Sequence, residues 1–252
     1  MHRLLAETAE IEKDVPSLSK EAEGHLRVVR PRDGESVELF DGRGLLREFS
    51  YSASKRRLEA RSPARRADRP YGGRLALFAC VTKGSRWDWT VEKATELGVA
   101  RIVPVLSART IVRIGAAERA AKRERWQKIA EEAARQSDAV WLPEVSEPVT
   151  FAAALERVKG TTCFVGALTE PKSAPLAAAV AQALEKTACA DCALFVGPEG
   201  DFTPDELAAL VAVAVPTSFG ETILRAETAA IYGLSVLTAA LDAAHAKGAN
   251  TR

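Results

Sequence analysis

Hydrophobic positions follow two different patterns along the chain, and the change falls near residue 72. From His25 to about Ser62 the apolar residues form short runs, such as HLRVV and SVELF, that alternate with polar residues or stand in small clusters. Asp41-Gly42 and Gly44 separate two of these runs, which is typical of a tight turn between strands. This pattern predicts a small β-barrel or meander in the N-terminal part.

An arginine-rich stretch, KRRLEARSPARRADRP at residues 55–70, runs into Pro70-Tyr71-Gly72-Gly73. Proline followed by paired glycines marks a break in regular structure. We therefore predict a last strand and a basic linker here. The chain would divide into one domain at residues 1–72 and a second at residues 73–252.

From residue 74 onward, continuous apolar runs alternate with amphipathic segments. Apolar runs predict strands buried on both faces at residues 74–81, 101–105, 161–167, 192–197 and 215–220. Helical spacing predicts helices at residues 86–98, 116–136, 175–186, 203–210 and 226–246, the first of them capped by Gly98. Strands that alternate with helices indicate an α/β fold with a mostly parallel sheet covered on both faces.

Three segments directly after predicted strands carry the candidate chemistry. They are GALTEP at 166–171, FVGPEGDFTPDE at 195–206 and FGETILRAETA at 219–229. In open α/β sheets, ligands bind at the carboxyl ends of the strands, where such loops meet. We expect a binding site formed by all three.

The GPEG tetrad is the most informative of these segments. Gly197 and Gly200 let the main chain approach a ligand closely, and Pro198 stiffens the turn. Thr203-Pro204-Asp205-Glu206 is a capping box with proline at the first helical position, so a helix begins at once. This loop suits a ligand held by main-chain groups, although glycine and proline can also simply mark a strand-to-helix turn.

Net charge is only +1, but the charges are unevenly distributed. Residues 24–74 carry 13 basic and 7 acidic side chains, and residues 83–135 carry 12 and 7. Residues 1–23 and 136–252 are acidic instead, with 3 against 6 and 7 against 14. Basic blocks attract phosphate backbones, so they favour nucleic-acid binding over an ordinary solvated surface.

Several classes of site lack their signatures. The chain has no G-x-G-x-x-G after a strand, no G-x-x-x-x-G-K-[ST], no H-E-x-x-H and no G-x-S-x-G. Cys189 and Cys192 form a C-x-x-C that could be half of a zinc site or a redox pair, but a second ligand pair is missing. We therefore expect structural cysteines and no metal.

Location follows from composition. No run approaches the roughly 18 apolar residues that would span a bilayer, so no membrane association is expected. The N-terminal MHRLLAETAEIEKD has acidic residues where a secretory signal needs an apolar stretch. A cytoplasmic protein is expected.

The run LFVGPEGDFTPDE, followed by FGETILRAETAA, resembles the C-terminal signature of the RsmE family. These are the 16S ribosomal RNA uracil-N3 methyltransferases of the SPOUT superfamily. The resemblance continues in KGSRWDWTVEKATELGVARIVPVLSART at 83–110, in WQKIAEEAARQS and LPEV within 126–145, and in HLRVVRPRDGESVELFDGRG at 25–44, in the same order. It implies an N-terminal PUA-like β-barrel that binds RNA and a C-terminal SPOUT α/β domain with a deep trefoil knot.

The resemblance also implies a ligand and partners. S-adenosylmethionine would lie in the cleft formed by the three loops, and the substrate would be 16S ribosomal RNA of the small ribosomal subunit. The family is dimeric through its last helix, which residues 226–246 would supply as a homodimer interface. The residues that map to the cofactor cleft are Leu168, Thr169, Gly197, Pro198, Glu199, Gly200, Phe219, Gly220, Ile223, Leu224 and Arg225.

Methyl transfer from a sulfonium to uracil N3 requires that the N3 proton leave. Glu199 and Glu227 are carboxylates that could accept it, and Arg225 could stabilise negative charge on the uracil oxygens. Glu227 could instead cap the final helix, and Arg225 could form a structural salt bridge. The candidate RNA contacts are Arg27, Arg30, Arg43, Arg56, Arg57, Lys83 and Arg86, with Arg65 and Arg66 adding to the same basic region.

The chain departs from the family pattern at a few positions. Asp201 stands where many relatives have glycine, Glu221-Thr222 where proline-arginine is usual, and Ala139 where an arginine is frequent. Residues 1–23 are longer and more acidic than the pattern. A methylase acting on another RNA site, or an inactive RNA-binding assembly factor, are therefore alternatives, although the intact GPEG and ILRAET loops favour an enzyme.

Overall fold

The structure, a computed structural model, describes residues 1–167, 173–186 and 191–249. The chain divides into two compact units, of which the first comprises Met1–Gly72 and Glu131–Leu142. The second comprises Gly73–Ala130 and Pro143–Arg252. The segment Glu131–Leu142 thus joins the first unit from within the sequence range predicted for the second domain.

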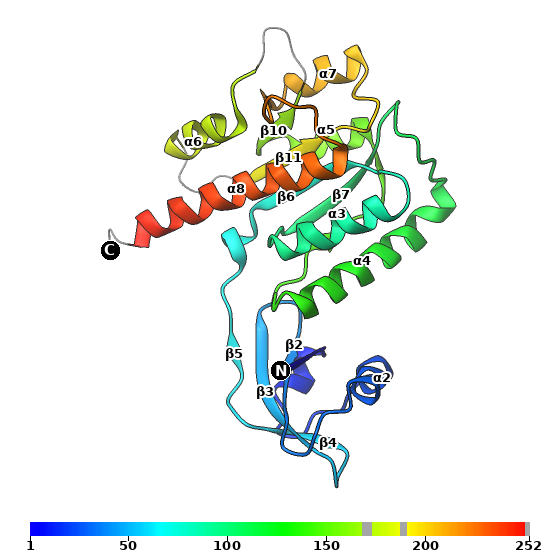
Figure 1. Ribbon diagram of the computed structural model, residues 1–252, viewed down its shortest axis with the longest axis vertical. Coiled ribbons are helices and arrows are strands. Elements are labelled where there is room, and N and C mark those ends of the chain that lie inside the picture. The colour runs from blue at the N-terminus through cyan, green and yellow to red at the C-terminus, as the bar shows by residue number, and fades with distance from the viewer. Residues whose placement is uncertain (168–172, 187–190, 250–252) are drawn as a thin grey trace. The chain divides into compact units, whose positions relative to one another are not determined.

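The first unit is built on a mixed five-stranded sheet (Figure 1). The strand order is β1-β2-β3-β4, with β5 also paired to β3. β1 pairs with β2 in parallel, and the other pairings are antiparallel. Its strands are β1 (His2–Leu5), β2 (Ser36–Phe40), β3 (Leu45–Ser52), β4 (Arg57–Ala60) and β5 (Arg65–Arg66), and its complete helices are α1 (Thr8–Ile11) and α2 (Lys20–Val29).

One strand prediction is wrong, because HLRVV lies in helix α2 and not in a strand. Ser19 caps this helix by accepting a hydrogen bond from the N–H of Ala22 at 3.1 Å. Ala22 is buried and Leu26 packs on the same core, four residues apart, which is helical spacing. The five residues from His25 to Val29 are too few to show the helical period, because the helix begins at Lys20.

The acidic N-terminal segment is part of the fold. β1 pairs along its whole length with β2, and Arg3 within it is only 5% exposed. The Nε atom of Arg3 donates to Oε1 of Glu38 at 2.8 Å, and Nη1 donates to the carbonyl oxygen of Ala134 at 2.9 Å. Its guanidinium also lies 4.5 Å from the centre of the Phe40 ring. A buried charge is tolerated here because it is paired and hydrogen-bonded.

The second unit contains a seven-stranded sheet whose pairings are all parallel, which confirms the predicted α/β architecture. The order is β12-β10-β11-β6-β7-β8, with β9 also paired to β7. The strands are β6 (Leu75–Cys80), β7 (Arg101–Leu106), β8 (Glu144–Val145), β9 (Val149–Thr150), β10 (Thr162–Gly166), β11 (Cys192–Val196) and β12 (Val215–Thr217).

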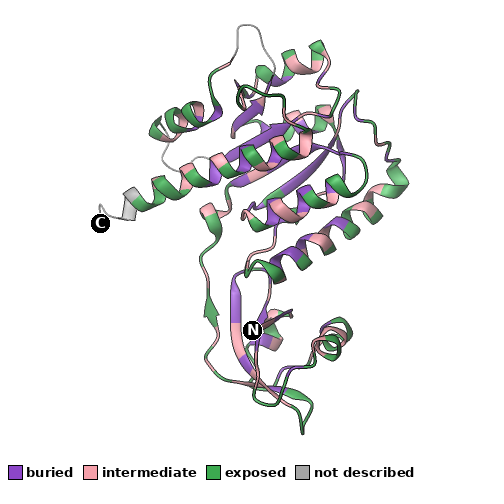
Figure 2. Ribbon diagram, in the orientation of Figure 1, coloured by how far each residue is buried: buried purple, intermediate pink, exposed green. Residues whose placement is uncertain are grey.

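Helices cover both faces of this sheet, as predicted. Phe78 and Phe195 share one buried cluster with residues of α5 and α7, whereas Leu194, on the opposite face of its strand, lies against Gly233 of α8. Figure 2 shows the central strands buried and the helices exposed on their outer sides. The helices are α3 (Ser85–Glu96), α4 (Arg119–Gln136, after the 3₁₀ turn Ala116–Glu118), α5 (Phe151–Val158), α6 (Leu176–Lys186), α7 (Pro204–Val211) and α8 (Ala226–Ala249).

Two predicted helix ends are confirmed in detail. Gly98 has φ +74°, and the N–H groups of Gly98 and Val99 bond to the carbonyls of Thr95 and Ala94, which closes α3 in the manner of a Schellman motif. Thr203 and Glu206 form the reciprocal capping box, with distances of 3.2 and 3.1 Å. The loop before α7 is therefore fixed at its helical end.

Among the described residues, α8 over Ala226–Ala246 is long and apolar enough to cross a membrane by length and composition alone, with a mean hydropathy of 1.3. It packs on β11, β6, α3 and α6 within the second unit. A helix that packs on a sheet can have the same length and apolar composition as a membrane-spanning helix. The composition of α8 is therefore weak evidence for a membrane span.

Candidate active site

Segments that follow three parallel strands meet through the side chain of Arg86. Arg86 is the second residue of α3, which follows β6; Glu199 follows β11, and Glu227 lies in the first turn of α8 after β12. Nη1 of Arg86 lies 3.7 Å from Oε1 of Glu199, and Nε lies 3.7 Å from Oε1 of Glu227. The structure thus brings together two predicted catalytic carboxylates and one residue predicted to contact RNA.

Burial distinguishes the two carboxylates. The side chain of Glu227 is 12% exposed and that of Glu199 is 26% exposed. Oε2 of Glu227 is buried and has no hydrogen-bond partner in the described part of the chain. A buried acceptor without a partner is costly in a folded protein, and a catalytic role is one reason to keep such an atom. Glu227 is therefore the less solvated of the two acceptors, with one oxygen still unpaired.

Arg225, the third predicted catalytic residue, is exposed and directly precedes α8. Its carbonyl oxygen accepts a hydrogen bond from the N–H of Ala229 at 2.8 Å, so its main chain begins the helix. Its exposed side chain is accessible to a substrate that approaches this edge.

The GPEG loop folds back on a buried aromatic ring. A Cβ atom at Gly197 would lie 3.0 Å from the Phe202 ring, so glycine permits the close approach of main chain to ring. The N–H of Asp201 bonds to the carbonyl of Pro198 at 3.0 Å and closes a turn. Asp201 has φ +58°, and its Oδ1 accepts from the N–H of Phe202 at 2.8 Å.

The conformation of Asp201 accounts for one departure from the family pattern. Left-handed backbone is natural for glycine, the residue that the resemblance led us to expect here, and aspartate is among the side chains that tolerate it best. Aspartate therefore preserves the turn at this position.

The loop after β12 is held by Phe219. A Cβ at Gly166 would lie 2.7 Å from the Phe219 ring, and one at Gly233 would lie 3.3 Å from it, so two glycines make room for the ring. The ring of Tyr232 packs 5.7 Å from the same ring, centre to centre. Beyond it Gly220 has φ +120°, a conformation that side chains rarely adopt. The aromatic ring fixes the loop at the point where the main chain turns sharply.

Two predicted apolar contacts of the cofactor lie on this loop. The side chain of Ile223 is 82% exposed, and Leu224 is half-buried. An exposed apolar side chain close to a glycine offers a surface on which the flat apolar part of a ligand can pack. Leu168 and Thr169, the other predicted contacts on the first loop, lie outside the described residues.

Arg109, in the connection after β7, also belongs to this region, although it lies in none of the three predicted loops. Its Nη1 donates hydrogen bonds to the carbonyl oxygens of Gly200 at 2.9 Å and Phe202 at 3.2 Å. It is 91 positions from Gly200, and no local pattern marks such a pairing.

The described thiols are buried and unreactive by position. Burial raises the pKa of the Cys80 thiol to about 11 and that of the Cys163 thiol to about 12, and burial also raises the pKa of Cys192. Cys189, the other half of the C-x-x-C, lies outside the described residues. Within residues 1–167, 173–186 and 191–249, no group of three or more His, Cys, Asp or Glu side chains could hold a metal ion.

All seven predicted RNA contacts have exposed side chains. Lys83 and Arg86 belong to the second unit, and Arg27, Arg30, Arg43, Arg56 and Arg57 belong to the first. Arg57 donates to Oε1 of Glu59 from Nε at 3.0 Å and from Nη2 at 2.8 Å, so its charge is already paired.

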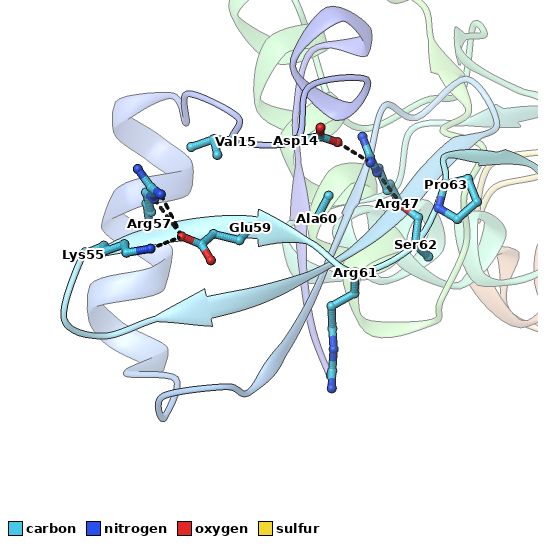
Figure 3. A pocket seen from close by; sticks show the side chains of 10 residues that line it. All are labelled: Asp14, Val15, Arg47, Lys55, Arg57, Glu59, Ala60, Arg61, Ser62 and Pro63. Atoms are coloured by element: carbon cyan, nitrogen blue, oxygen red, sulfur yellow. Dashed lines mark hydrogen bonds and ion pairs between the residues drawn. The ribbon is translucent and has the colours of Figure 1, made fainter.

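An open groove of about 580 Å³ in the first unit contains Arg57 (Figure 3). Lys55 shares Glu59 with Arg57, at 3.0 Å. Arg47 bonds to Asp14 at 2.8 Å and to the carbonyl of Ser62 at 2.6 Å, whereas Arg61 points away from these pairs. Much of the positive charge in this groove is neutralised by carboxylates of the same unit.

Comparisons with known proteins agree on one family. A family model described as an RNA methyltransferase domain matches residues 69–238. Ribosomal RNA small subunit methyltransferase E of Synechocystis is 31% identical over 222 residues, which cover 86% of this chain and 70% of that protein. The protein of the same name from Mycobacterium bovis is 32% identical over 227 residues, which cover 86% of this chain and 84% of that protein. A crystal structure of ribosomal RNA small subunit methyltransferase E from Neisseria gonorrhoeae, bound to S-adenosyl methionine, superposes with a TM-score of 0.79 at 26% identity, covering 95% of this chain and 97% of that one.

Proposed function

We propose that this chain, which belongs to the RNA methyltransferase family, methylates N3 of a uridine in 16S ribosomal RNA. The methyl donor is S-adenosylmethionine. Within the family, the chain belongs to the ribosomal RNA small subunit methyltransferase E group. The observation that carries the proposal is the structural match, over nearly the whole chain, to a relative that holds this cofactor. The convergence of Arg86, Glu199 and Glu227 at the carboxyl edge of the sheet supports it.

The cofactor would be held by the loops after β10, β11 and β12. S-adenosylmethionine, when bound, supplies an electrophilic methyl group on sulfur. Gly197 and Gly220 allow close approach of the main chain, and the exposed Ile223 offers an apolar surface. The proposed contacts are Leu168, Thr169, Gly197, Pro198, Glu199, Gly200, Phe219, Gly220, Ile223, Leu224 and Arg225.

Side chains of this protein would accept the proton that leaves uracil N3 and stabilise the negative charge that develops on the uracil. As N3 gains its methyl group, it loses a proton, and a carboxylate of Glu227 or Glu199 accepts it. Arg225, exposed beside this edge, stabilises negative charge on the uracil carbonyl oxygens. Arg86 holds both carboxylates near one another through their Oε1 atoms.

The substrate would be the small ribosomal subunit, bound in the cytoplasm by basic side chains of both units. We assign Arg27, Arg30, Arg43, Arg56, Arg57, Lys83 and Arg86 to phosphate contacts, and their exposure supports this assignment. Family membership also supports a PUA-like barrel at residues 1–72 and a trefoil knot in the α/β domain at residues 73–252.

A homodimer through α8 completes the proposal. Only 28% of the apolar window Ala226–Ala246 is buried within one chain, and Tyr232 on this helix is 40% exposed. An apolar helix that stays largely uncovered in one copy suits an interface with a second copy. Size-exclusion chromatography with light scattering distinguishes the dimer from a monomer.

Calorimetric titration of the purified protein with S-adenosylmethionine tests the proposal, followed by methylation of small ribosomal subunits with a radiolabelled methyl donor. Binding that is abolished in Gly197→Asp and weakened in Arg225→Ala, together with label in 16S RNA, is the expected result. A well-folded wild-type protein that binds no cofactor would remove the proposal and favour the RNA-binding assembly factor. Label at another RNA position would favour the alternative methylase.

A further inference from the structure

Two consecutive residues after β7 fasten the loop that follows β11. Nη1 of Arg109 donates hydrogen bonds to the main-chain oxygens of Gly200 and Phe202, at 2.9 and 3.2 Å. The N–H of Ala108 donates to Oε1 of Glu206 at 2.8 Å, while Oε2 of Glu206 completes the capping box of α7. The loop is therefore tied to a second loop at its exposed bend and at its helical end.

Contacts from outside the loop support the bend. Asp201 adopts left-handed φ, which aspartate tolerates better than most residues but less readily than glycine. Phe202 anchors one side of the bend, since its ring packs 5.8 Å from that of Phe195 in the core. Gly200 is exposed on the other side, and Arg109 supplies a charged donor to its carbonyl.

Arg109 extends from a rigid base. Ser107 and Thr110, which flank it, are 4% and 1% exposed. The N–H of Ser107 donates to Oγ1 of Thr110 at 3.0 Å, and the N–H of Thr110 donates to the carbonyl of Ser107 at 3.2 Å. A side chain that leaves such a closed turn can hold its partner in one place, because the turn itself does not need to be ordered by the contact.

We propose that Arg109 is a positioning residue for cofactor binding, which fixes the main chain of the Gly197–Phe202 loop in the shape that receives S-adenosylmethionine. The inference rests on the proposed function, since it assumes that this loop contacts the cofactor. Arg109 acts on the carbonyls of the loop and through them on the loop's other main-chain groups. A loop ordered in advance binds more tightly because less freedom is lost when the ligand arrives.

Three variants isolate this role. Arg109→Ala removes both hydrogen bonds, and Arg109→Lys keeps one charged donor group that can reach the same carbonyls. Arg113→Ala is the matched control, because Arg113 is an exposed arginine of the same connection between β7 and α4. All three remove or alter an exposed side chain, so folding is expected to survive.

The measurements are the dissociation constant for S-adenosylmethionine, the KM and kcat of methylation, and hydrogen exchange of the amides at 199–203 in the ligand-free protein. Arg109→Ala is expected to raise the dissociation constant and KM about tenfold, to leave kcat at saturating cofactor within about twofold, and to speed amide exchange in this loop. Arg109→Lys is expected to restore most of the affinity, and Arg113→Ala to behave as wild type.

Two results would overturn the inference in distinguishable ways. If wild-type protein binds S-adenosylmethionine and Arg109→Ala binds it equally well, the positioning role is wrong while the proposed function stands. If wild-type protein binds no S-adenosylmethionine, the proposed function fails and the inference fails with it. Faster exchange throughout the second unit, and not in this loop alone, would show a general structural role and also contradict the inference.

Discussion

Nε of Arg86 lies 3.7 Å from Oε1 of Glu227, and Oε2 of the same carboxylate is buried without a partner among the described residues. Arg86 comes from the start of α3 and Glu227 from the first turn of α8, so the pair joins two helices that pack against each other. The guanidinium is shared with Glu199 at the same distance. Arg86 thus faces the carboxylates of the site as well as solvent.

If Glu227 is the proposed proton acceptor, Glu227→Gln is expected to lower kcat about 100-fold or more, because it removes the basic carboxylate while keeping the size of the side chain. Affinity for S-adenosylmethionine should stay within about threefold of wild type, since Gln preserves the packing of α8. Single-turnover methylation of small ribosomal subunits measures the first effect and calorimetry the second. Glu199→Gln is the comparison, and an equal loss in that variant would argue against Glu227 as the acceptor.

Arg3→Ala is expected to destabilise the first unit by about 3 kcal/mol, because it removes the partner at 2.8 Å from the buried Glu38 carboxylate and leaves Arg65, at 3.8 Å, as its remaining ion pair. Urea unfolding followed by circular dichroism measures the shift in midpoint. Arg27→Ala serves as control, since the Arg27–Glu23 pair is exposed and its loss should cost less than about 1 kcal/mol. Equal shifts in the urea midpoint for the two variants would mean that the buried ion pair contributes no more to stability than the exposed one.

Gly233→Ala is expected to lower stability even though alanine favours helices more than glycine does. A Cβ at Gly233 would lie 2.6 Å from Cδ2 of Leu194, so the buried Leu194 side chain or α8 itself must shift, at a cost of about 1–3 kcal/mol. Gly24→Ala in α2 is the opposite case, because nothing lies within 4 Å of the added atom, and it should gain about 0.5–1 kcal/mol. Thermal unfolding of both variants checks the sign, and stabilisation by Gly233→Ala would contradict the close packing.

Stability should fall above about pH 9 through the buried thiols. Burial raises the pKa of Cys80 from 9.0 to about 11, so the folded state binds this proton more tightly than the unfolded chain does. The contribution is complete below pH 9 and is lost as the pH rises toward 11, by roughly 2–3 kcal/mol. Urea midpoints between pH 8 and 11 measure it.

Cys80→Ala should reduce this dependence at high pH by the share that Cys80 contributes, while Cys163, whose pKa burial raises to about 12, keeps its own share. Native protein at pH 8 should also react slowly at Cys80 and Cys163 with a thiol reagent, and quickly in urea. Rapid reaction of the folded protein at these two residues would contradict the burial.

Much of the second unit could be predicted from local pattern. The strands Leu75–Cys80 and Cys192–Val196 are continuous apolar runs, and the cap at Thr203–Glu206 is a four-residue motif. All three can be predicted because the residues that define them are neighbours in the sequence. The strands β8 and β9 have two residues each and helix α5 has eight, and the hydrophobic pattern predicts none of the three. Elements this short carry too little periodicity to stand out.

Residue types at fixed local spacing are enough to predict the parallel sheet, the loops at its carboxyl edge and the family to which those loops belong. Three contacts are visible only in the folded protein: Arg86 with Glu199 and Glu227, Arg109 with the carbonyl of Gly200, and Arg3 with Glu38 in the first sheet. These contacts join residues from distant parts of the chain. Their distances follow from which strands become neighbours, and the order β12-β10-β11-β6-β7-β8 is set by packing of the whole unit, which no local period encodes.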